Sequence, residues 1–202
     1  MPDNFDYSDK LNHVEQRSEL SVLLQNQITE LQSSTGGRAD WPKHTRFAGE
    51  AEFWMQVHRA LLGATSTLPQ RCATMMLLDE PSERKKHLTQ ISQLGGQLIH
   101  HAHTHHHVED HHFFPIFKTT YPKLNHHLEL LDGDHHVLTE ALDQLETALR
   151  TLPVRTDQSR NGQSEFKVKT EQLLAAARRV NKLFNRHIAD EEEICIPAIL
   201  QL

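Results

Sequence analysis

One segment of the chain carries the pattern from which the rest is interpreted: His105-His106-His107-Val108-Glu109-Asp110-His111-His112-Phe113-Phe114-Pro115. The C-terminal region repeats its spacing as His187-Ile188-Ala189-Asp190-Glu191-Glu192-Glu193-Ile194-Cys195-Ile196-Pro197. In both segments a glutamate follows a histidine by four residues, a second carboxylate follows directly, and a proline stands six residues after the glutamate. Two separate matches of this kind indicate a shared role.

Helical geometry turns each segment into a pair of converging ligands. Positions i and i+4 of an α-helix lie on one face, about 6 Å apart along the axis. His105 therefore lies beside Glu109, and His187 lies beside Glu191. An imidazole nitrogen and a carboxylate oxygen from the same helix suit a borderline metal such as Fe, Mn or Zn. Two such pairs predict two metal ions.

Composition and charge restrict the class of protein. The chain has 202 residues, 37% of them hydrophobic, and a mean hydropathy of -0.58, which fits one buried helical domain with an extension. No apolar run approaches the roughly 18 residues of a membrane helix, so we expect no membrane partner. The net charge of -6 argues against nucleic acid as the main partner.

Cysteine content and the N-terminal residues predict a cytoplasmic protein. Cys72 and Cys195 are too few for a disulfide framework, and a reducing compartment is expected for such a chain. Residues 1–6 are acidic and lack the positive region followed by an apolar one that marks a secretory signal.

Residues 1–45 are predicted to form an N-terminal helical extension. Apolar residues recur at helical spacing between Ser8 and Gln32, and residues 33–37 then break the helix. The apolar stripe is imperfect, so this helix either covers the bundle or pairs with a second copy to form a homodimer. The patterning favours packing on the bundle.

Residues 46–202 are predicted to form an all-α, antiparallel four-helix bundle. Apolar periodicity predicts helices over Thr45–Ser66, Ser82–Phe114, Lys123–Leu149 and Ser164–Ile196. Prolines and polar residues separate them, because Pro69 ends the first helix, Pro115 and Pro122 bracket a turn, and residues 152–162 form a polar loop. Four helices with short to medium connections are typical of this fold.

Each predicted helix turns at least one candidate ligand inward. His58 lies on the apolar face of the first helix, and His135, rather than His136, shares the leucine stripe of the third. Together with the two pairs they give six candidate metal ligands: His58, His105, Glu109, His135, His187 and Glu191. Asp110 and Glu192 are expected either to orient ligand imidazoles or to face solvent.

Histidine is the outlier of the composition, since eight of the 17 histidines lie between His100 and His112. His101, one turn before His105, is predicted on the inner side, as a proton carrier, an extra ligand or a residue at the rim. His112 is also predicted on the inner side, and five other members of the cluster are interpreted as solvated surface: His100, His103, His106, His107 and His111. If this cluster bound metal instead, the chain would be a metal store or chaperone with more than two ions.

Burial of these polar groups without a cation would be costly. Each buried, unsatisfied polar group costs ~1–3 kcal/mol, and carboxylates cost more. For four imidazoles and two carboxylates the sum rivals the ~5–15 kcal/mol stability of a whole domain. Two divalent cations remove this cost. Six ligands for two ions also leave coordination positions open, unlike structural zinc with its four ligands, and the absence of sulfur argues against copper.

These motifs resemble the hemerythrin-like (HHE cation-binding) family over about residues 46–202. The resemblance implies two Fe ions, bridged by oxo, hydroxo or carboxylate groups, that meet O2, NO or peroxide inside the bundle. Spacing alone leaves Mn and Zn open. The ferritin-like di-iron proteins differ, because they use Glu-x2-His motifs and more carboxylates.

One position departs from the oxygen-carrying hemerythrins. Those proteins place two histidines one turn apart on the third helix, whereas Leu131 stands four residues before His135 here. The resulting four-His/two-Glu set is closest to the repair-of-iron-centres branch. Proteins of that branch carry an N-terminal region with cysteine, which residues 1–45 lack.

The leading hypothesis is a cytoplasmic non-haem di-iron protein that binds or activates O2, peroxide or NO. If it is an enzyme, it is an oxidoreductase, with Glu109 and Glu191 bridging the ions. The alternative is a non-catalytic oxygen or iron sensor, with the N-terminal helix as its output surface, or a metal storage module.

Overall fold

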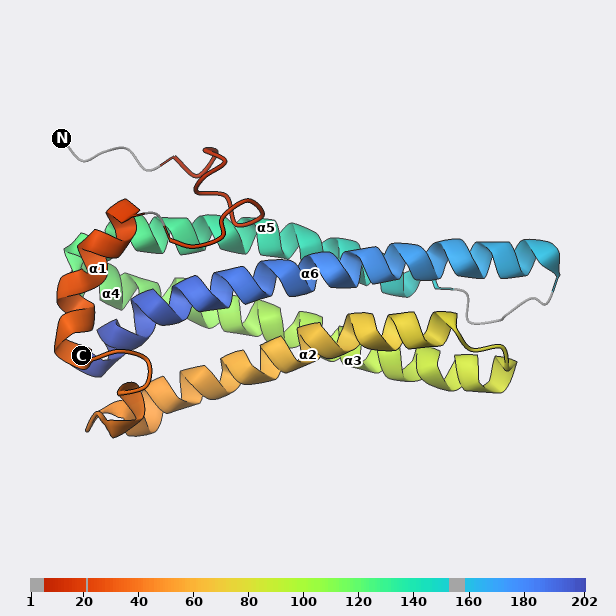
Figure 1. Ribbon diagram of the computed structural model, residues 1–202, viewed down its shortest axis with the longest axis horizontal. Coiled ribbons are helices and arrows are strands. Elements are labelled where there is room, and N and C mark those ends of the chain that lie inside the picture. Colours follow the sequence, from red (N-terminus) through yellow and green to blue (C-terminus); the bar gives the residue numbers. More distant parts are fainter. Residues whose placement is uncertain (1–5, 21, 153–158) are drawn as a thin grey trace. The chain divides into compact units, whose positions relative to one another are not determined.

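The structure is a computed structural model that describes residues 6–20, 22–152 and 159–202. Four long helices form the predicted all-α antiparallel bundle: α2 (Glu52–Met76), α3 (Pro81–Val108), α5 (Asn125–Arg150) and α6 (Arg160–Gln201) (Figure 1). Two shorter helices, α1 (Val22–Thr35) and α4 (Phe114–Thr120), complete the set. Within the described ranges, no helix combines the length and hydrophobicity needed to cross a lipid bilayer.

The helices contribute to two compact units. Unit 1 comprises Met1–Ala60, Thr104–Val137 and Asn185–Leu202, and unit 2 comprises Leu61–His103 and Leu138–Phe184. Unit 1 therefore holds the N-terminal region, α1, α4 and one end of each long helix. The sequence-based division into an extension of residues 1–45 and a bundle of residues 46–202 stays a prediction.

Proline affects the helices less than expected. Pro69 lies inside α2, which continues to Met76, so the predicted end of this helix at Pro69 is wrong. The missing N–H of Pro69 is one lost hydrogen bond, and burial of Leu68, Cys72 and Met75 on the same helix offsets it. Pro197 likewise lies inside α6.

The chain around Pro115 also continues as helix instead of turning. A π-helical turn, η3 (Glu109–Phe113), follows α3 and leads directly into α4, where Pro115 occupies the first turn. Proline is tolerated there because its N–H would have no intrahelical partner. The turn predicted between Pro115 and Pro122 is confined to Tyr121 (φ -128°, ψ 72°), because α4 occupies most of that segment. The start of α2 also differs from Thr45, since Gly49 has a φ of +116° and α2 begins at Glu52.

The packing of unit 2 depends on a close approach of two helices. At Gly95 of α3, a Cβ atom would lie 2.5 Å from Leu149 Cδ1 of α5, so any larger residue would have to displace the Leu149 side chain. At the next residue, Gly96, a Cβ atom would meet nothing within 4 Å. The predicted loop at 152–162 falls largely outside the described residues, and α6 begins at Arg160.

The N-terminal region is only half helical. Residues 7–20 form successive turns, with backbone bonds such as Asn12 N to Asp9 O (3.0 Å), and the first half of the helix predicted over Ser8–Gln32 is therefore wrong. In α1, Leu24 and Ile28 are buried in a cluster with Phe117 and Leu128. The covering role is thus observed for α1, while pairing with a second copy stays a prediction.

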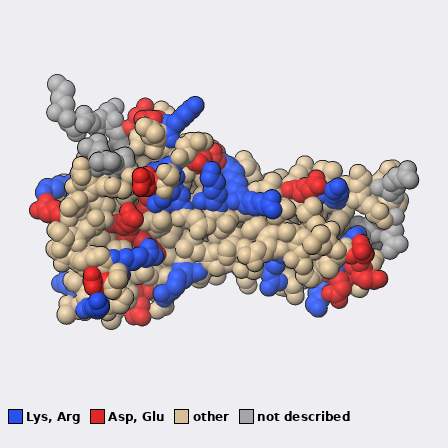
Figure 2. Space-filling view, in the orientation of Figure 1, with Lys and Arg blue, Asp and Glu red and all other residues tan. Residues whose placement is uncertain are grey.

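Charged side chains lie mostly at the surface, where Figure 2 shows basic and acidic groups interspersed with uncharged areas. Unit 1 departs from this rule, because the following charged residues are buried in it: Arg17, Glu109, Asp134, Asp190, Glu191 and Glu192. Charges in such a position need partners. They surround the candidate site.

Candidate metal centre

Five imidazoles and two carboxylates converge inside unit 1. Group A consists of His58 from α2, His105 from α3, Glu109 from η3 and Glu191 from α6. Group B consists of His106 from α3, His135 from α5 and His187 from α6. Within each group the candidate ligand atoms lie within 4.8 Å of one another. The structure thus brings together all six candidate ligands and adds His106.

In group A, the ring nitrogens point at a common centre. His58 Nε2 lies 3.2 Å from His105 Nε2, and it lies 3.3 Å from Glu191 Oε1. His105 Nε2 lies 2.9 Å from Glu109 Oε1, at the i+4 spacing expected from the sequence. Two nitrogens and two carboxylates that meet in this way could hold a metal ion.

In group B, three imidazole rings pack against one another. The rings of His106 and His135 are stacked, with centroids 4.2 Å apart, and the His187 ring meets His135 at an edge, with centroids 4.9 Å apart. The rings come from α3, α5 and α6, so only the folded unit assembles them.

The two glutamates connect the groups. Glu109 directs Oε1 to His105 of group A, and its Oε2 lies 3.4 Å from His135 Nε2 of group B. Glu191 directs Oε1 to His58 of group A, and its Oε2 lies 3.4 Å from His187 Nε2 of group B. Each carboxylate therefore faces both groups, and Glu191 Oε2 also lies 3.7 Å from His105 Nε2 of group A.

Three further carboxylates contact the opposite nitrogen of three of these rings. Glu192 Oε1 lies 3.1 Å from His58 Nδ1, and Asp110 Oδ1 lies 2.8 Å from His135 Nδ1. Asp134 Oδ2, which the sequence did not single out, lies 3.1 Å from His187 Nδ1. An Nδ1–H that donates to a carboxylate leaves the Nε2 lone pair directed at the centre. Of the two expectations for Asp110 and Glu192, orientation of imidazoles is the one observed.

Aromatic side chains wall the centre. The Trp54 indole Nε1 donates a hydrogen bond to Glu191 Oε1 at 2.6 Å, and its ring lies 4.4 Å from the Phe113 ring. Phe114 stacks on His135 with centroids 5.6 Å apart. Trp54 and Phe114 are buried, so this wall is apolar and raises the strength of charge interactions inside it.

The carboxylates of the centre shift the pKa values of the imidazoles that they contact. Burial opposes protonation of His58, but the charge of Glu191 and hydrogen bonds to Glu191 and Glu192 outweigh it and raise the pKa to about 9. In the same way, carboxylates raise the pKa of His105 and of His135 to about 10. Burial and the neighbouring imidazoles lower the pKa of His106 well below its ordinary value, so this ring stays neutral.

The polar atoms at the centre fit metal ions better than they fit one another. Buried atoms of both glutamates and of two histidines have no hydrogen bond of acceptable geometry within the described chain: Glu109 Oε1 and Oε2, Glu191 Oε2, His135 Nε2 and His187 Nε2. Their close approaches are ion-pair contacts without hydrogen-bond alignment. Buried groups in this state are destabilising unless a cation binds them.

Comparison with protein families agrees with this donor set. Residues 50–199 match the model of the hemerythrin HHE cation binding domain. The chain belongs to this family. The match covers the helices that supply every member of groups A and B and begins after α1. Comparisons with curated proteins and with solved structures gave no match.

Two placements in this hemerythrin-like domain differ from the sequence-based ones. His106, interpreted as solvated surface, is buried, whereas His101, expected on the inner side, is exposed. The buried stripe of α3 runs through Ile91, Leu98 and Ala102. His101 and His106 flank this stripe on opposite sides, and sequence periodicity does not say which flank the neighbouring helices cover. Burial of Leu131 in α5 agrees with its lack of a ligand role.

Four other histidines of the cluster are exposed as expected: His100, His103, His107 and His111. The prediction for His112 is wrong, because it was expected on the inner side and is exposed. His107 and His111 lie side by side with ring centroids 4.1 Å apart, one helical turn from each other. Neither belongs to group A or B.

Proposed function

We propose that this hemerythrin-like protein binds two Fe ions in unit 1 and uses them to bind or activate O2, peroxide or NO. Group A would hold one ion and group B the other, with Glu109 and Glu191 bridging them. The observation that supports this most is that each glutamate faces histidines of both groups.

The donor set favours iron over other metals. Neither group includes a cysteine, and burial raises the pKa of the Cys195 thiol well above its ordinary value, so it stays protonated. Structural zinc sites are closed by four ligands, whereas the ion of group B would have five donors if Glu109 and Glu191 bridge. Iron held by nitrogen and oxygen donors with open positions supplies redox chemistry toward small oxidants. Mn remains the nearest competitor.

Residues of this chain would prepare the centre for such a ligand. Glu192, Asp110 and Asp134 fix the rings of His58, His135 and His187 through Nδ1. Trp54 fixes one oxygen of Glu191 by donating its indole N–H. The apolar wall of Trp54, Phe113 and Phe114 limits the access of water.

A non-catalytic sensor is the second candidate, and one contact favours it. Arg17 of the N-terminal region binds Asp134, which in turn contacts His187. A change at the centre would thereby reach a segment outside the family match. Metal storage by the surface histidines is the third candidate function, and it requires that the chain bind more than two metal ions.

Metal analysis of the isolated chain, with visible absorption before and after air is admitted to the reduced protein, tests the proposal. We expect two Fe per chain and an absorption change on air exposure. The double variant His107→Ala/His111→Ala serves as the matched control, because it removes exposed histidines only, and it should retain both ions. A folded chain that takes up no iron would contradict the proposal, and loss of ions in the control would favour storage.

A further inference from the structure

A buried arginine from the N-terminal region lies directly behind group B. The side chain of Arg17 is 1% exposed, its Nη2 lies 2.6 Å from Asp134 Oδ2, and its Nε lies 2.7 Å from Asp190 Oδ2. It therefore joins α5 to α6, and Arg186 binds the same Asp190 from within α6. The family match begins at residue 50, so Arg17 lies outside it.

Arg17 and a candidate metal ligand share one carboxylate oxygen. Asp134 Oδ2, which accepts from Arg17, also lies 3.1 Å from His187 Nδ1. The other oxygen, Oδ1, accepts a hydrogen bond from the Tyr7 hydroxyl at 2.8 Å. With both oxygens held from the N-terminal side, the carboxylate of Asp134 has one orientation in which to receive the Nδ1–H of His187.

A second arginine repeats the arrangement behind group A. Arg38 pairs with Glu192 Oε2, while Glu192 Oε1 lies 3.1 Å from His58 Nδ1. The side chain of Arg38 is 59% exposed, so solvent screens its charge and its effect is smaller than that of Arg17. In each group, therefore, an arginine from the N-terminal region contacts a buried carboxylate, and this carboxylate contacts a histidine of the group.

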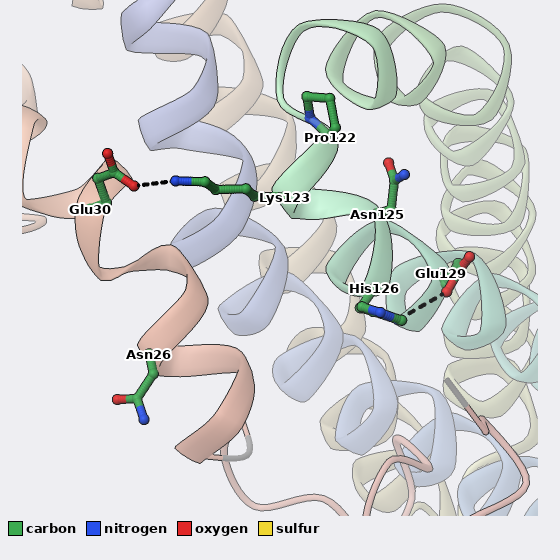
Figure 3. A pocket seen from close by; sticks show the side chains of 7 residues that line it. All are labelled: Asn26, Glu30, Pro122, Lys123, Asn125, His126 and Glu129. Carbon is green, nitrogen blue, oxygen red and sulfur yellow. Dashed lines mark hydrogen bonds and ion pairs between the residues drawn. The ribbon is translucent and has the colours of Figure 1, made fainter. Parts of the chain in front are cut away.

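A stability role alone does not account for this arrangement. An ion pair that only attached the N-terminal region would have no reason to end on the back of a candidate ligand in each group. The ion pair between Lys123 and Glu30 only attaches one segment to another. It joins α1 to η4 (Pro122–Leu124) at 2.6 Å, and both side chains are 78% exposed. The two residues line a pocket at the surface (Figure 3).

Tyr7 offers a way to disturb the docking of residues 7–20 without replacing Arg17. A Cβ atom at Gly133 would lie 2.3 Å from Tyr7 Cδ2, so the tyrosine ring rests on the backbone of α5. Gly133→Ala would keep α5 helical, because alanine favours helix, and would displace Tyr7. This substitution replaces no residue of groups A and B and keeps Arg17, but displacing Tyr7 also removes its hydrogen bond to Asp134.

We propose that residues 7–20 are a positioning segment of the metal centre, in which Arg17 holds Asp134 so that His187 presents Nε2 to an ion. Arg38 does the same for His58 through Glu192, with a smaller effect. This inference rests on the proposed metal binding. Because coupling between two sites is reciprocal, metal binding must also stabilise the docked segment.

The test is a titration of the metal-free full-length chain with Co2+, read by visible absorption and by hydrogen exchange of residues 7–20. We expect Arg17→Gln to weaken one of the two ions by ~10- to 100-fold, the usual effect of losing a partner that orients a ligand, and to leave the other unchanged. Arg17→Lys should recover part of the affinity, since it keeps the charge but not the two-pronged geometry. Lys123→Ala should match the wild type.

Gly133→Ala keeps the test informative if Arg17→Gln does not fold. It should speed exchange of residues 7–20, weaken the same ion, and make exchange less sensitive to Co2+. The inference is overturned if either folded variant exposes the segment yet binds both ions as the wild type does. It is also overturned if Co2+ leaves exchange of the segment unchanged in the wild type. A wild-type chain that takes up no Co2+ contradicts the proposed function as well.

Discussion

His101 and His106 flank the buried stripe of α3, but only His106 is buried, because neighbouring helices cover its flank. His106 lies on the flank covered by α5 and α6, where it stacks on His135 at 4.2 Å and meets the His187 ring at an edge, 5.7 Å away. His101 lies on the exposed flank. A neutral, buried imidazole beside two candidate ligands is well placed to bind metal, whereas an exposed one is not.

His106→Ala tests this difference. It removes one nitrogen of group B, and we expect at least ~10-fold weaker binding of one ion with the other unaffected, as for loss of a ligand or its partner. Isothermal titration with Co2+ or Mn2+ measures the change. His101→Ala is the matched control from the same helix, and equal effects of the two variants would contradict the assignment of His106 to the centre.

At the scale of elements, α3 and α5 approach closely in unit 2, and two adjacent glycines of α3 differ in the space beside them. Gly95 has Leu149 in the place of its missing Cβ atom, whereas Gly96 has open space. Glycine in a helix interior otherwise costs stability relative to alanine. Only Gly95 therefore has a packing reason to be glycine.

Substitution of each glycine by alanine should change stability with opposite sign. Gly95→Ala forces Leu149 to move, and overpacking of this kind costs ~1–3 kcal/mol. Gly96→Ala should gain up to about 1 kcal/mol from helix propensity. Urea unfolding of the two variants measures both values. Metal stoichiometry should stay unchanged in each, because both glycines belong to unit 2, and a lost ion in Gly95→Ala would contradict this separation.

At the scale of the whole molecule, protons and metal ions compete for the same centre. In the metal-free chain the pKa of His58 is raised to about 9, and the pKa values of His105 and His135 are raised to about 10. A histidine whose pKa is raised on folding stabilises the fold fully below its unfolded pKa of about 6.5, and this contribution is lost as the pH rises through the folded value.

The metal-free chain should therefore lose stability between pH 7 and pH 10, on the order of 3 kcal/mol for each of these three histidines. The metal-loaded chain should not, because the cations replace the protons and stabilise the fold by mass action. Chemical unfolding at pH 6.5 and pH 9.5, with and without bound metal, gives the four free energies of unfolding that this prediction compares. A metal-free chain whose stability is flat over this range would show that the imidazoles are not protonated in the core.

The sequence by itself determined the helical bundle and the two His-x3-Glu pairs, because helical periodicity is a local property that 3.6 residues per turn fixes. It also selected His58 and His135 correctly as inward residues, since apolar neighbours one turn away mark the buried face. The prolines were overestimated as helix breakers, because burial of Leu68, Cys72 and Met75 offsets one lost hydrogen bond at Pro69.

Only the tertiary structure decided which flank of α3 is covered, and hence that His106 belongs to the centre. It alone brought Arg17 to Asp134, 117 residues apart in the chain. No local pattern encodes such a contact, because it depends on how residues 7–20 pack on α5 and α6. The pairing of glutamate oxygens with histidines from different helices likewise exists only where four helices meet.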